Sequence, residues 1–325
     1  MNRHRSSRIS PAAVICVSID CERDKGRGWR LRRPASFSGV HDGIAGKLQP
    51  LFMAAGAKPT YLLSPEVIRD ASSADRITGL PGSYELGTHL HAEYVGPDAD
   101  DDVESTMFQA ALSPAVERAK LEALTTLFVE RFGRQPRSFR AGRFGIGSAS
   151  LSILADLGYA VDSSVTPFVD WRGAGPGAPC FREAPVSPYQ PDPAHPARRG
   201  PSPLWEVPVT IRPGWRQRLP VVGRRLPHRW LRPTWGSSRG LRALARQVLS
   251  ERAGGAGVSG VPDARCPVVL NVMFHNVEVV AGASPYARDQ GQADAILGRL
   301  ADLLAFARSA GIRSVGLGDL PELLA

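Results

Sequence analysis

Short apolar runs alternate with amphipathic stretches along the first half of the chain. Residues 12–19 form a continuous apolar and β-branched run, the pattern of a parallel strand that is covered on both faces. Residues 44–57 instead carry apolar side chains at helical spacing. The same two patterns predict further strands at 59–63, 84–91, 137–139 and 159–162, and further helices that begin at residues 64, 113 and 148. This alternation predicts a parallel α/β sheet or barrel with helices outside it.

The regular alternation stops near residue 171 and resumes near residue 267. The segment between is rich in Pro, Gly and Arg, and within it only residues 204–211 have the pattern of a strand. Beyond it, the sequence predicts a strand at 267–274, a helix at 292–310, a strand at 313–317 and a short helix that begins at Asp319. We therefore expect a flexible N-terminal segment at 1–11 and a single domain at 12–325, with an insertion at about 171–265.

The basic residues are unevenly distributed along the chain. The net charge is +9, yet residues 196–252 hold 13 Arg against two Glu, so the rest of the chain is close to neutral. A local basic cluster on a neutral body indicates contact with an anionic surface, and no nucleic-acid-binding motif accompanies it. Trp and Arg are interleaved through residues 212–235, which suits either an interfacial surface on anionic lipid or a loop packed over the barrel.

Cysteine usage and hydropathy bear on the cellular compartment. The four cysteines have no CxxC spacing, so we expect reduced thiols with structural roles. The apolar run near the N-terminus is short and ends in Asp20, Cys21 and Glu22, which favours a strand over a secretory signal. No window approaches the roughly 18 apolar residues of a membrane span. These features predict a cytoplasmic protein, peripheral to the inner membrane face if the basic segment binds lipid.

Polar residues that can bind a metal follow three of the predicted strands. Asp20 and Glu22 end the first strand, His89 and His91 end the third, and His275 ends a late one. The carboxyl ends of parallel strands converge, and two imidazoles with one or two carboxylates are a usual site for a divalent metal with one position left for water. His89 and His91 are two apart on a strand and so point to the same face. Each residue alone has a simpler interpretation: a hydrogen-bonded polar histidine, a cap, or a solvated charge.

Five segments occur in the order of the motifs of one enzyme family. They are an apolar strand ending in acidic residues (18–22), a lead-in to paired histidines (85–91), an Arg before a Gly-rich aromatic turn (139–145), a strand segment (158–164), and the strand that ends in His275. With these motifs the chain resembles the polysaccharide deacetylase family, also called NodB-homology proteins. The resemblance extends over most of the chain.

The resemblance implies an irregular (β/α) barrel of the polysaccharide deacetylase type. It also implies removal of an N-acyl group, usually acetyl, from an amino sugar in a polysaccharide or a lipid-linked glycan precursor. Asp20 would be the general base, Arg140 the residue that orients and charges it, and His275 the general acid. A divalent metal, zinc before cobalt, nickel or manganese, would be held by Glu22, His89 and His91.

The chemistry of amide hydrolysis calls for such a set of groups. An amide carbonyl is a poor electrophile, so a metal must polarise it and activate water, while a carboxylate accepts the proton of the water. The amine leaves only if it is protonated, which is a task for an imidazole such as that of His275. Arg140 near Asp20 would keep that carboxylate ionised.

Two positions depart from the family pattern. The family has two adjacent Asp in its first motif, whereas here Cys21 stands in the second place and Glu22 follows it. Cys21 is therefore an alternative ligand to Glu22. The second histidine of the family lies four residues after the first, a position held here by Glu93, so Glu93 would replace His91 as a ligand if this segment were helical.

Three functions are compatible with this pattern. The first is a metal-dependent N-deacetylase of saccharides that contain amino sugars. The second keeps the barrel and changes the substrate to a formyl-amino sugar or a small amide such as a ureide. The third is a catalytically inactive carbohydrate-binding homologue, which would have no use for Asp20, Arg140 and His275 together.

Overall fold

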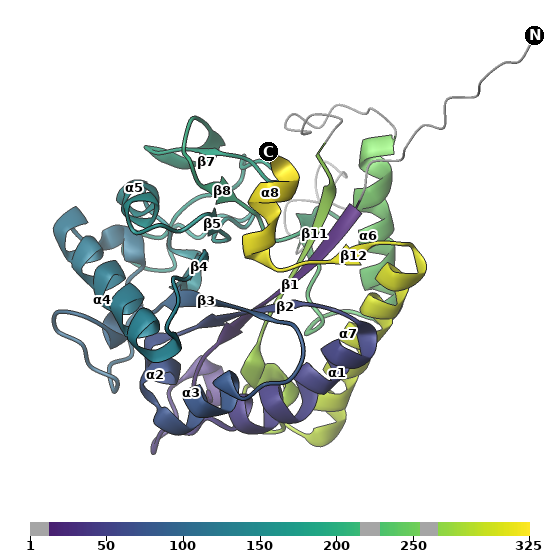
Figure 1. Ribbon diagram of the computed structural model, residues 1–325, viewed down its shortest axis with the longest axis horizontal. Helices are drawn as coiled ribbons and strands as arrows, with labels where there is room; N and C mark the ends of the chain where they lie inside the picture. Colours follow the sequence, from purple (N-terminus) through teal and green to yellow (C-terminus); the bar gives the residue numbers. More distant parts are fainter. Residues whose placement is uncertain (1–12, 215–227, 254–265) are drawn as a thin grey trace, which may run out of the picture.

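A curled sheet of eight parallel strands forms the centre of the molecule (Figure 1). The structure is a computed structural model that describes residues 13–214, 228–253 and 266–325. The strands follow the order β11-β1-β2-β3-β4-β5-β8, and β12 pairs with β1. Their bounds are β1 (Ala13–Cys21), β2 (Pro59–Leu63), β3 (Glu85–Leu90), β4 (Ser138–Ala141), β5 (Val161–Asp162), β8 (Trp205–Glu206), β11 (Val268–His275) and β12 (Arg313–Ser314).

The sheet curls into an irregular barrel because the segment after β8 returns to β11. The backbone N–H of Thr210 donates to the carbonyl oxygen of Asn271 over 3.0 Å. The side-chain amide of Asn271 in turn donates to the carbonyl oxygens of Val207 and Pro208. The expected irregular (β/α) barrel is therefore confirmed, and its irregularity lies where this segment bridges the two ends of the sheet.

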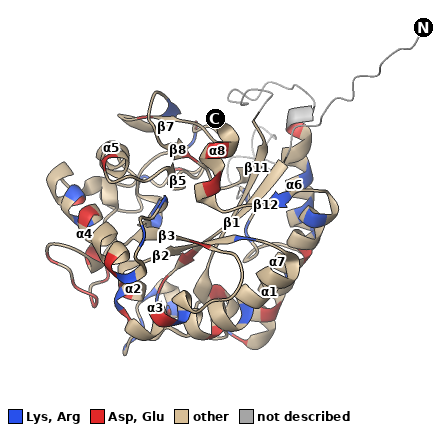
Figure 2. Cartoon of the chain, viewed as in Figure 1, with Lys and Arg blue, Asp and Glu red and all other residues tan. Residues whose placement is uncertain are grey.

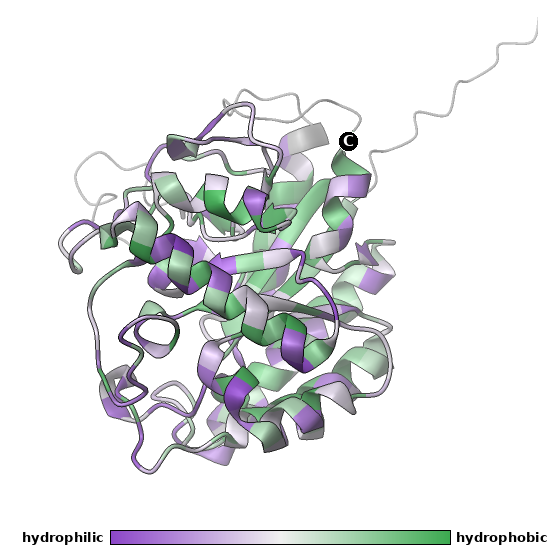
Figure 3. Ribbon diagram, turned by 60° about the vertical axis from the view of Figure 1, so that its left-hand side comes forward, coloured by the Kyte–Doolittle hydropathy of each residue, from purple (hydrophilic) through white to green (hydrophobic). Residues whose placement is uncertain are grey.

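Helices cover the outside of the sheet (Figure 1). They pack on the sheet because their apolar residues recur at helical spacing and form one buried face. Helix α4 buries Leu121, Leu124 and Phe128, and α7 buries Ile296 and Leu300. In Figure 3 the strands are largely apolar, whereas loops and outer helix faces carry most of the hydrophilic residues. The helices are α1 (Gln49–Ala55), α2 (Pro65–Arg69), α3 (Ala71–Thr78), α4 (Pro114–Phe132), α5 (Ser148–Asp156), α6 (Ser238–Ala253), α7 (Gln290–Ser309) and α8 (Leu320–Leu324).

Side chains of β1 alternate between the barrel interior and the helices. Val14 and Cys16 pack inside the barrel with Leu320 of α8, which closes the end of the barrel at which the strands begin. Ile15 and Ile19 belong to the larger core that the helices complete. The continuous apolar run therefore reflects burial on both faces of the strand, as its sequence predicted.

The segment predicted as an insertion contains more regular structure than its sequence pattern indicated. Helix α6 buries Leu241, Leu244 and Val248, and Figure 2 shows basic residues along it. This helix was not predicted, because the Arg-rich composition obscured an apolar stripe at helical spacing. Short antiparallel pairs add β6 (Pro191–Asp192) with β7 (His195–Arg199), and β9 (Ile211–Arg212) with β10 (Arg229–Trp230).

Several predicted bounds shift in the structure. The strand expected at 204–211 divides into β8 and β9, and the strand expected at 313–317 shortens to β12. The predicted segment 1–11 and residues 215–227 of the Trp- and Arg-containing stretch lie outside the described residues. In the described part of the chain, every helix is too short or too polar to cross a bilayer.

Candidate active site

Asp20 and Arg140 form a buried ion pair at the end of the barrel where the strands finish. Arg140 Nη1 lies 2.6 Å from Asp20 Oδ1, and the two side chains are 0% and 2% exposed. The guanidinium also donates to the hydroxyl oxygens of Ser18 and Ser163 and to the carbonyl oxygen of Ser163. Arg140 is therefore fixed inside the barrel and occupies Oδ1 of Asp20, so that Oδ2 is left for the centre of the site.

The environment of Asp20 keeps its carboxyl group ionised. Burial alone would raise the pKa of Asp20, but the nearby Arg140, His89 and His275 favour the carboxylate, and the net result is a lowered pKa. Oδ2 lies 4.0 Å from His89 Nε2 and 3.9 Å from His275 Nε2. Asp20 is thus a buried carboxylate that is kept charged between two imidazoles.

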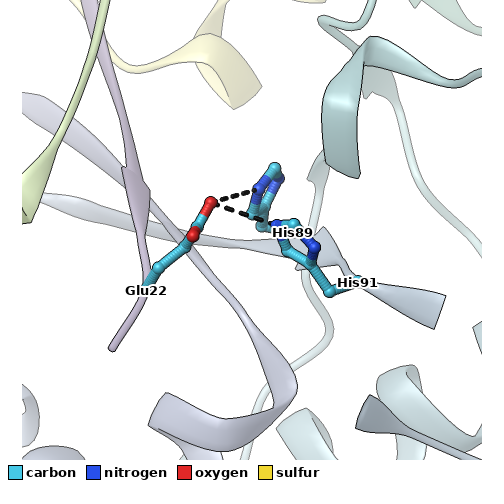
Figure 4. Close-up of side chains that lie close together, drawn as sticks. All are labelled: Glu22, His89 and His91. Atoms are coloured by element: carbon cyan, nitrogen blue, oxygen red, sulfur yellow. Dashed lines mark hydrogen bonds and ion pairs between the residues drawn. The ribbon is translucent and has the colours of Figure 1, made fainter. Parts of the chain in front are cut away.

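Glu22, His89 and His91 bring three donor atoms to one point (Figure 4). Glu22 Oε1 lies 3.3 Å from His89 Nε2 and 3.1 Å from His91 Nε2. A metal with bonds of about 2.1 Å in tetrahedral geometry holds its ligand atoms roughly 3.4 Å apart, so separations of this size fit a divalent ion. The three residues are buried, and they form a group that could hold a metal ion.

Hydrogen bonding fixes the orientation of His89. Its Nδ1 lies 3.0 Å from the carbonyl oxygen of Arg140. A carbonyl oxygen only accepts, so Nδ1 carries a proton, and Nε2 is the ring nitrogen that faces the donor set. A backbone partner of this kind is the usual support of a metal-binding histidine.

Lys25 balances the charge of Glu22. Its Nζ lies 2.8 Å from Glu22 Oε2, and both side chains are almost completely buried. Burial alone would raise the pKa of Glu22, yet Lys25 and His91 hold it well below its ordinary value. Burial also opposes protonation of His91, but Glu22 and Glu93 raise the pKa of His91 to about 9. The protein without metal therefore holds at His91 a positive charge that a bound cation would replace.

His275 stands across the site from the paired histidines. Its Nε2 lies 3.9 Å from Asp20 Oδ2 and 3.8 Å from Glu22 Oε1. Its Nδ1 lies 2.8 Å from Oε1 of Glu278, a completely buried carboxylate that also accepts hydrogen bonds from Arg232 and Thr234. Burial would raise the pKa of Glu278, but Arg232 and His275 lower it, so Glu278 is charged.

A cavity of about 600 Å³ opens over these groups. Asp20, Glu22 and the three histidines line its floor, so a ligand that enters the cavity reaches both Asp20 and His275. Its wall and mouth are formed largely by aromatic and charged side chains, among them Trp29, Tyr94, Phe144, Trp171, Tyr286, Arg30, Arg143 and Glu104.

The two alternative ligands lie outside the cluster of donor atoms. Cys21 is buried in the core on the helix side of β1, with its Sγ 3.3 Å from the carbonyl oxygen of Ile19. Alternation along the strand turns its side chain away from those of Asp20 and Glu22. Glu93 follows β3 in a separate turn, where Oε1 lies 2.6 Å from Arg143 Nη2 and 3.5 Å from His91 Nδ1.

The structure brings all six predicted site residues to one end of the barrel and adds three that the sequence did not point to. Lys25, Arg232 and Glu278 were missed because each acts through a partner that only the fold supplies. A carboxylate three residues after His275 was the one sequence signal that could have indicated Glu278. Arg232 lies within the basic segment, and no sequence signal separates it from the other arginines there.

Comparison with known proteins supports the fold. The sequence matches no protein-family model and no curated protein. Among solved structures, a protein from Parabacteroides distasonis assigned as a glycoside hydrolase/deacetylase has a TM-score of 0.64 at 14% identity, over 97% of this chain and 71% of that one. A protein from Pseudomonas aeruginosa PAO1 assigned as a polysaccharide deacetylase has a TM-score of 0.54 at 14% identity, over 96% and 90%.

A third similar structure has a different activity. The GH57-type branching enzyme of Pyrococcus horikoshii has a TM-score of 0.54 at 10% identity, over 95% of this chain and 70% of that one. The chain therefore has the polysaccharide deacetylase type of fold that its motifs predicted. Because one fold can carry different reactions, the residues of the site, and not the fold, decide the reaction.

Proposed function

We propose that this protein is a metal-dependent hydrolase that removes an N-acetyl group from an amino sugar in a saccharide. The observation that carries the proposal is the placement of a charged carboxylate, Asp20, between a three-residue donor set and the imidazole of His275. Amide hydrolysis needs a metal that polarises the carbonyl. It also needs a proton acceptor and a proton donor on opposite sides of that carbonyl. The five sequence motifs, in family order, support the same reaction.

Asp20 is suited to take the proton of the attacking water. Arg140 engages its Oδ1, which leaves Oδ2 as the accepting atom and fixes its direction. Because Arg140 also keeps Asp20 charged, the base is available at neutral pH. Arg140 acts through Asp20 and is completely buried, so we assign it as a positioning residue.

His275 is suited to protonate the departing amine. Its Nε2 faces the cavity while Nδ1 points to Glu278. A charged carboxylate on Nδ1 keeps the proton of the neutral ring on that side and stabilises the imidazolium form when Nε2 gains a proton. His275 would then carry a proton between the bulk solvent and the leaving nitrogen.

Glu22, His89 and His91 would hold the metal. When bound, a divalent ion would polarise the acetamide carbonyl and make water more acidic. One carboxylate and two imidazoles favour zinc, with cobalt, nickel and manganese as alternatives. Lys25 holds Oε2 of Glu22, so Glu22 would offer the single atom Oε1 to the ion.

Two other functions are compatible with the same fold. A formyl-amino sugar or a small amide would use the same groups, and only the pocket around the acyl chain would differ. An inactive carbohydrate-binding protein would not retain a charged base with a dedicated arginine and an imidazole with a dedicated carboxylate. The pairs Asp20–Arg140 and His275–Glu278 therefore favour an enzyme over a protein that only binds carbohydrate.

Metal analysis combined with mass-spectrometric screening of N-acylated sugars tests the proposal. We expect loss of one acetyl mass, at a rate abolished by chelation and restored by zinc. Asp20→Asn should abolish turnover and keep the metal, and His89→Ala should lose the metal, while the exposed control His195→Ala keeps both. Full metal occupancy in His89→Ala, or turnover by Asp20→Asn, would contradict the assignment.

The Arg-rich segment bears on the substrate and on the location of the protein. The Arg-rich segment would bring the protein to an anionic membrane, so a lipid-linked saccharide on the cytoplasmic face is a candidate substrate. Co-sedimentation with vesicles containing 30% phosphatidylglycerol, about a third anionic lipid, tests this. Deletion of the stretch from 215 to 227 should release the protein, and unchanged sedimentation would remove the membrane from the proposal.

A further inference from the structure

His91 differs from His89 in the support of its second ring nitrogen. Its Nε2 lies 3.1 Å from Glu22 Oε1 and faces the donor set (Figure 4). Its Nδ1 is buried and has no hydrogen-bond partner among the described residues, whereas Nδ1 of His89 lies 3.0 Å from a carbonyl oxygen. A metal-binding histidine ordinarily donates from its second nitrogen to a fixed acceptor. Nδ1 of His91 therefore needs an acceptor to complete its support.

Glu93 is the carboxylate beside this nitrogen. Its Oε1 lies 3.5 Å from His91 Nδ1, a few tenths of an ångström beyond the usual length of an N–H···O hydrogen bond. A single helical turn at Ala92–Tyr94 brings Glu93 back onto the imidazole, and the N–H of Tyr94 donates to the carbonyl oxygen of His91 over 3.0 Å. Both side chains of the His91–Glu93 pair are 6% exposed, so the pair is shielded from water.

Arg143 fixes the carboxylate of Glu93. Its Nη2 donates to Oε1 over 2.6 Å, and its Nη1 lies 3.4 Å from Oε2. The same Nη2 donates to the carbonyl oxygen of Ser105 over 2.6 Å. The N–H of Asp100 donates to the carbonyl oxygen of Glu93 over 2.8 Å. Because a guanidinium that contacts both oxygens sets the plane of a carboxylate, Glu93 presents Oε1 in a defined direction.

The turn that carries Arg143 packs directly on His91. Arg143 has a φ of 56°, in the left-handed region that residues other than glycine rarely adopt. A Cβ at the preceding Gly142 would lie 2.6 Å from the carbonyl oxygen of Leu90 and 3.2 Å from His91 Nδ1. Strained conformations persist where the surrounding structure imposes them, commonly at functional sites. The backbone therefore sets the distance between Arg143 and the imidazole.

Tyr94 restricts the imidazole of His91 from its face. The two rings stack with centres 5.6 Å apart and planes 28° from parallel. The guanidinium of Arg23 lies 5.2 Å from the centre of the Tyr94 ring. The stack limits tilting of the imidazole and leaves its edges to Glu22 on one side and Glu93 on the other.

We propose that Glu93 is a positioning residue for the metal site. Its carboxylate, held by Arg143, accepts the proton of His91 Nδ1 and keeps Nε2 directed at the donor set. The proposal rests on the proposed metal-dependent function and goes beyond it in giving Glu93 and Arg143 a role in metal affinity. Arg143 engages both oxygens of Glu93, which favours this role over direct ligation of the metal by Glu93.

The zinc affinity of the full-length protein, measured by competition with a chromophoric chelator, tests the role of Glu93. We expect Glu93→Leu to weaken zinc binding by about 10- to 100-fold because it removes the acceptor. Glu93→Gln keeps a neutral acceptor and should weaken binding less, and it provides the same comparison if the apolar variant does not fold. The matched control is Glu251→Gln, which breaks a partly buried pair with Arg212 of 2.8 Å and should leave the affinity unchanged.

The Nδ1 proton of His91 gives a readout that a purely structural role of Glu93 would not change. In ring-nitrogen NMR spectra of the zinc-loaded protein, we expect this proton to be protected from exchange with water in the wild type and in Glu251→Gln. It should lose its protection in Glu93→Leu. Weaker zinc binding with unchanged protection of this proton overturns the positioning role.

Arg143→Met separates positioning from the effect of charge. The cation of Arg143 by itself repels a metal ion, so its removal would tighten binding if only charge mattered. Positioning predicts the opposite sign, because Arg143→Met releases Glu93 and should weaken zinc binding. Added to Glu93→Leu, it should cause no further change. Tighter binding in Arg143→Met, or recovery of affinity in the double variant, overturns the proposal.

The outcomes distinguish this inference from the proposed function. Unchanged zinc affinity in Glu93→Leu, with affinity lost in His89→Ala, overturns the positioning role and leaves the proposed function intact. Failure of the wild type to bind zinc overturns both. A weaker zinc site with an unprotected Nδ1 proton in Glu93→Leu supports the positioning role. It does so even if the wild type releases no acetate, a result that counts against the proposed reaction alone.

Discussion

Nδ1 of His275 lies 2.8 Å from Oε1 of Glu278, three residues further along the chain. Glu278 is completely buried and is held in turn by Arg232 from the segment predicted as an insertion. Nδ1 of the imidazole therefore contacts Glu278, and Nε2 faces the cavity. The guanidinium of Arg232 also lies 4.4 Å from the ring centre of Trp235, so this one side chain contacts both the exposed tryptophan and the carboxylate behind the candidate acid.

Replacement of Glu278 by Gln should slow the chemical step without weakening substrate binding. An amide can donate to Nδ1, which favours the ring tautomer with the proton on the wrong nitrogen. We expect kcat to fall by about 10- to 100-fold with KM nearly unchanged. Steady-state kinetics provide the measurement, with the exposed Glu322→Gln as control. A rise in KM at constant kcat would mean that Glu278 only shapes the cavity.

Replacement of Lys25 by Met should make the protein depend more on metal for its stability. The substitution removes the Lys25 cation from beside the buried carboxylate of Glu22, which costs about 3 to 5 kcal/mol. A divalent ion supplies the missing charge, so the rise in Tm on adding zinc should be larger than in the wild type. The partly exposed pair of Lys58 with Asp319, at 2.7 Å, supplies the control Lys58→Met. Equal increases in Tm for Lys25→Met and wild type would contradict this account of Lys25.

Replacement of Glu206 by Gln should change how stability depends on pH. Asp162 and Glu206 face each other on paired strands, and burial together with their mutual repulsion raises the pKa of Glu206 well above its ordinary value. The folded protein thus binds a proton more tightly than the unfolded chain. The associated stability is complete below the unfolded pKa of about 4.3 and declines as pH rises towards the folded pKa.

Glu206→Gln removes this proton linkage. Relative to wild type, the variant should gain stability between pH 5 and 8, by at most about 1.4 kcal/mol per pH unit. Urea unfolding at several pH values measures the difference, with the exposed Glu130→Gln as control. Parallel stability curves for Glu206→Gln and wild type would contradict the raised pKa of Glu206.

Gly87 in β3 should not tolerate a side chain. A Cβ there would lie 2.5 Å from the carbonyl oxygen of Ser138 in β4 and 2.8 Å from Leu62 in β2. We expect Gly87→Ala to lower the free energy of unfolding by about 1 to 3 kcal/mol, and to weaken metal binding by displacing His89 two residues on. Gly298→Ala in α7 has open space and should instead stabilise by up to about 1 kcal/mol. Equal stability of the two variants would contradict the close approach of β3 and β4.

Much of the candidate site could be predicted because its residues follow apolar strands. Alternation of strands and helices is a local property, set by the period of apolar residues, and in a parallel sheet it places every strand end on one edge. Asp20, Glu22, His89, His91 and His275 were found in this way. The same strand periodicity places Cys21 on the opposite face of the strand. This could be concluded only once the structure showed that β1 extends to Cys21.

The sequence by itself determined the barrel and the residues at the ends of its strands, because burial of periodic apolar faces permits few arrangements. Only the tertiary structure decided the partners of those residues: Lys25 beside Glu22, Glu278 and Arg232 behind His275, and the ring of Trp29 against that of His275. These contacts join loops and an irregular segment whose paths carry no periodic signal. Their geometry follows from how the whole chain packs, since the partners of a charged or aromatic side chain are close in space but can be distant in the sequence.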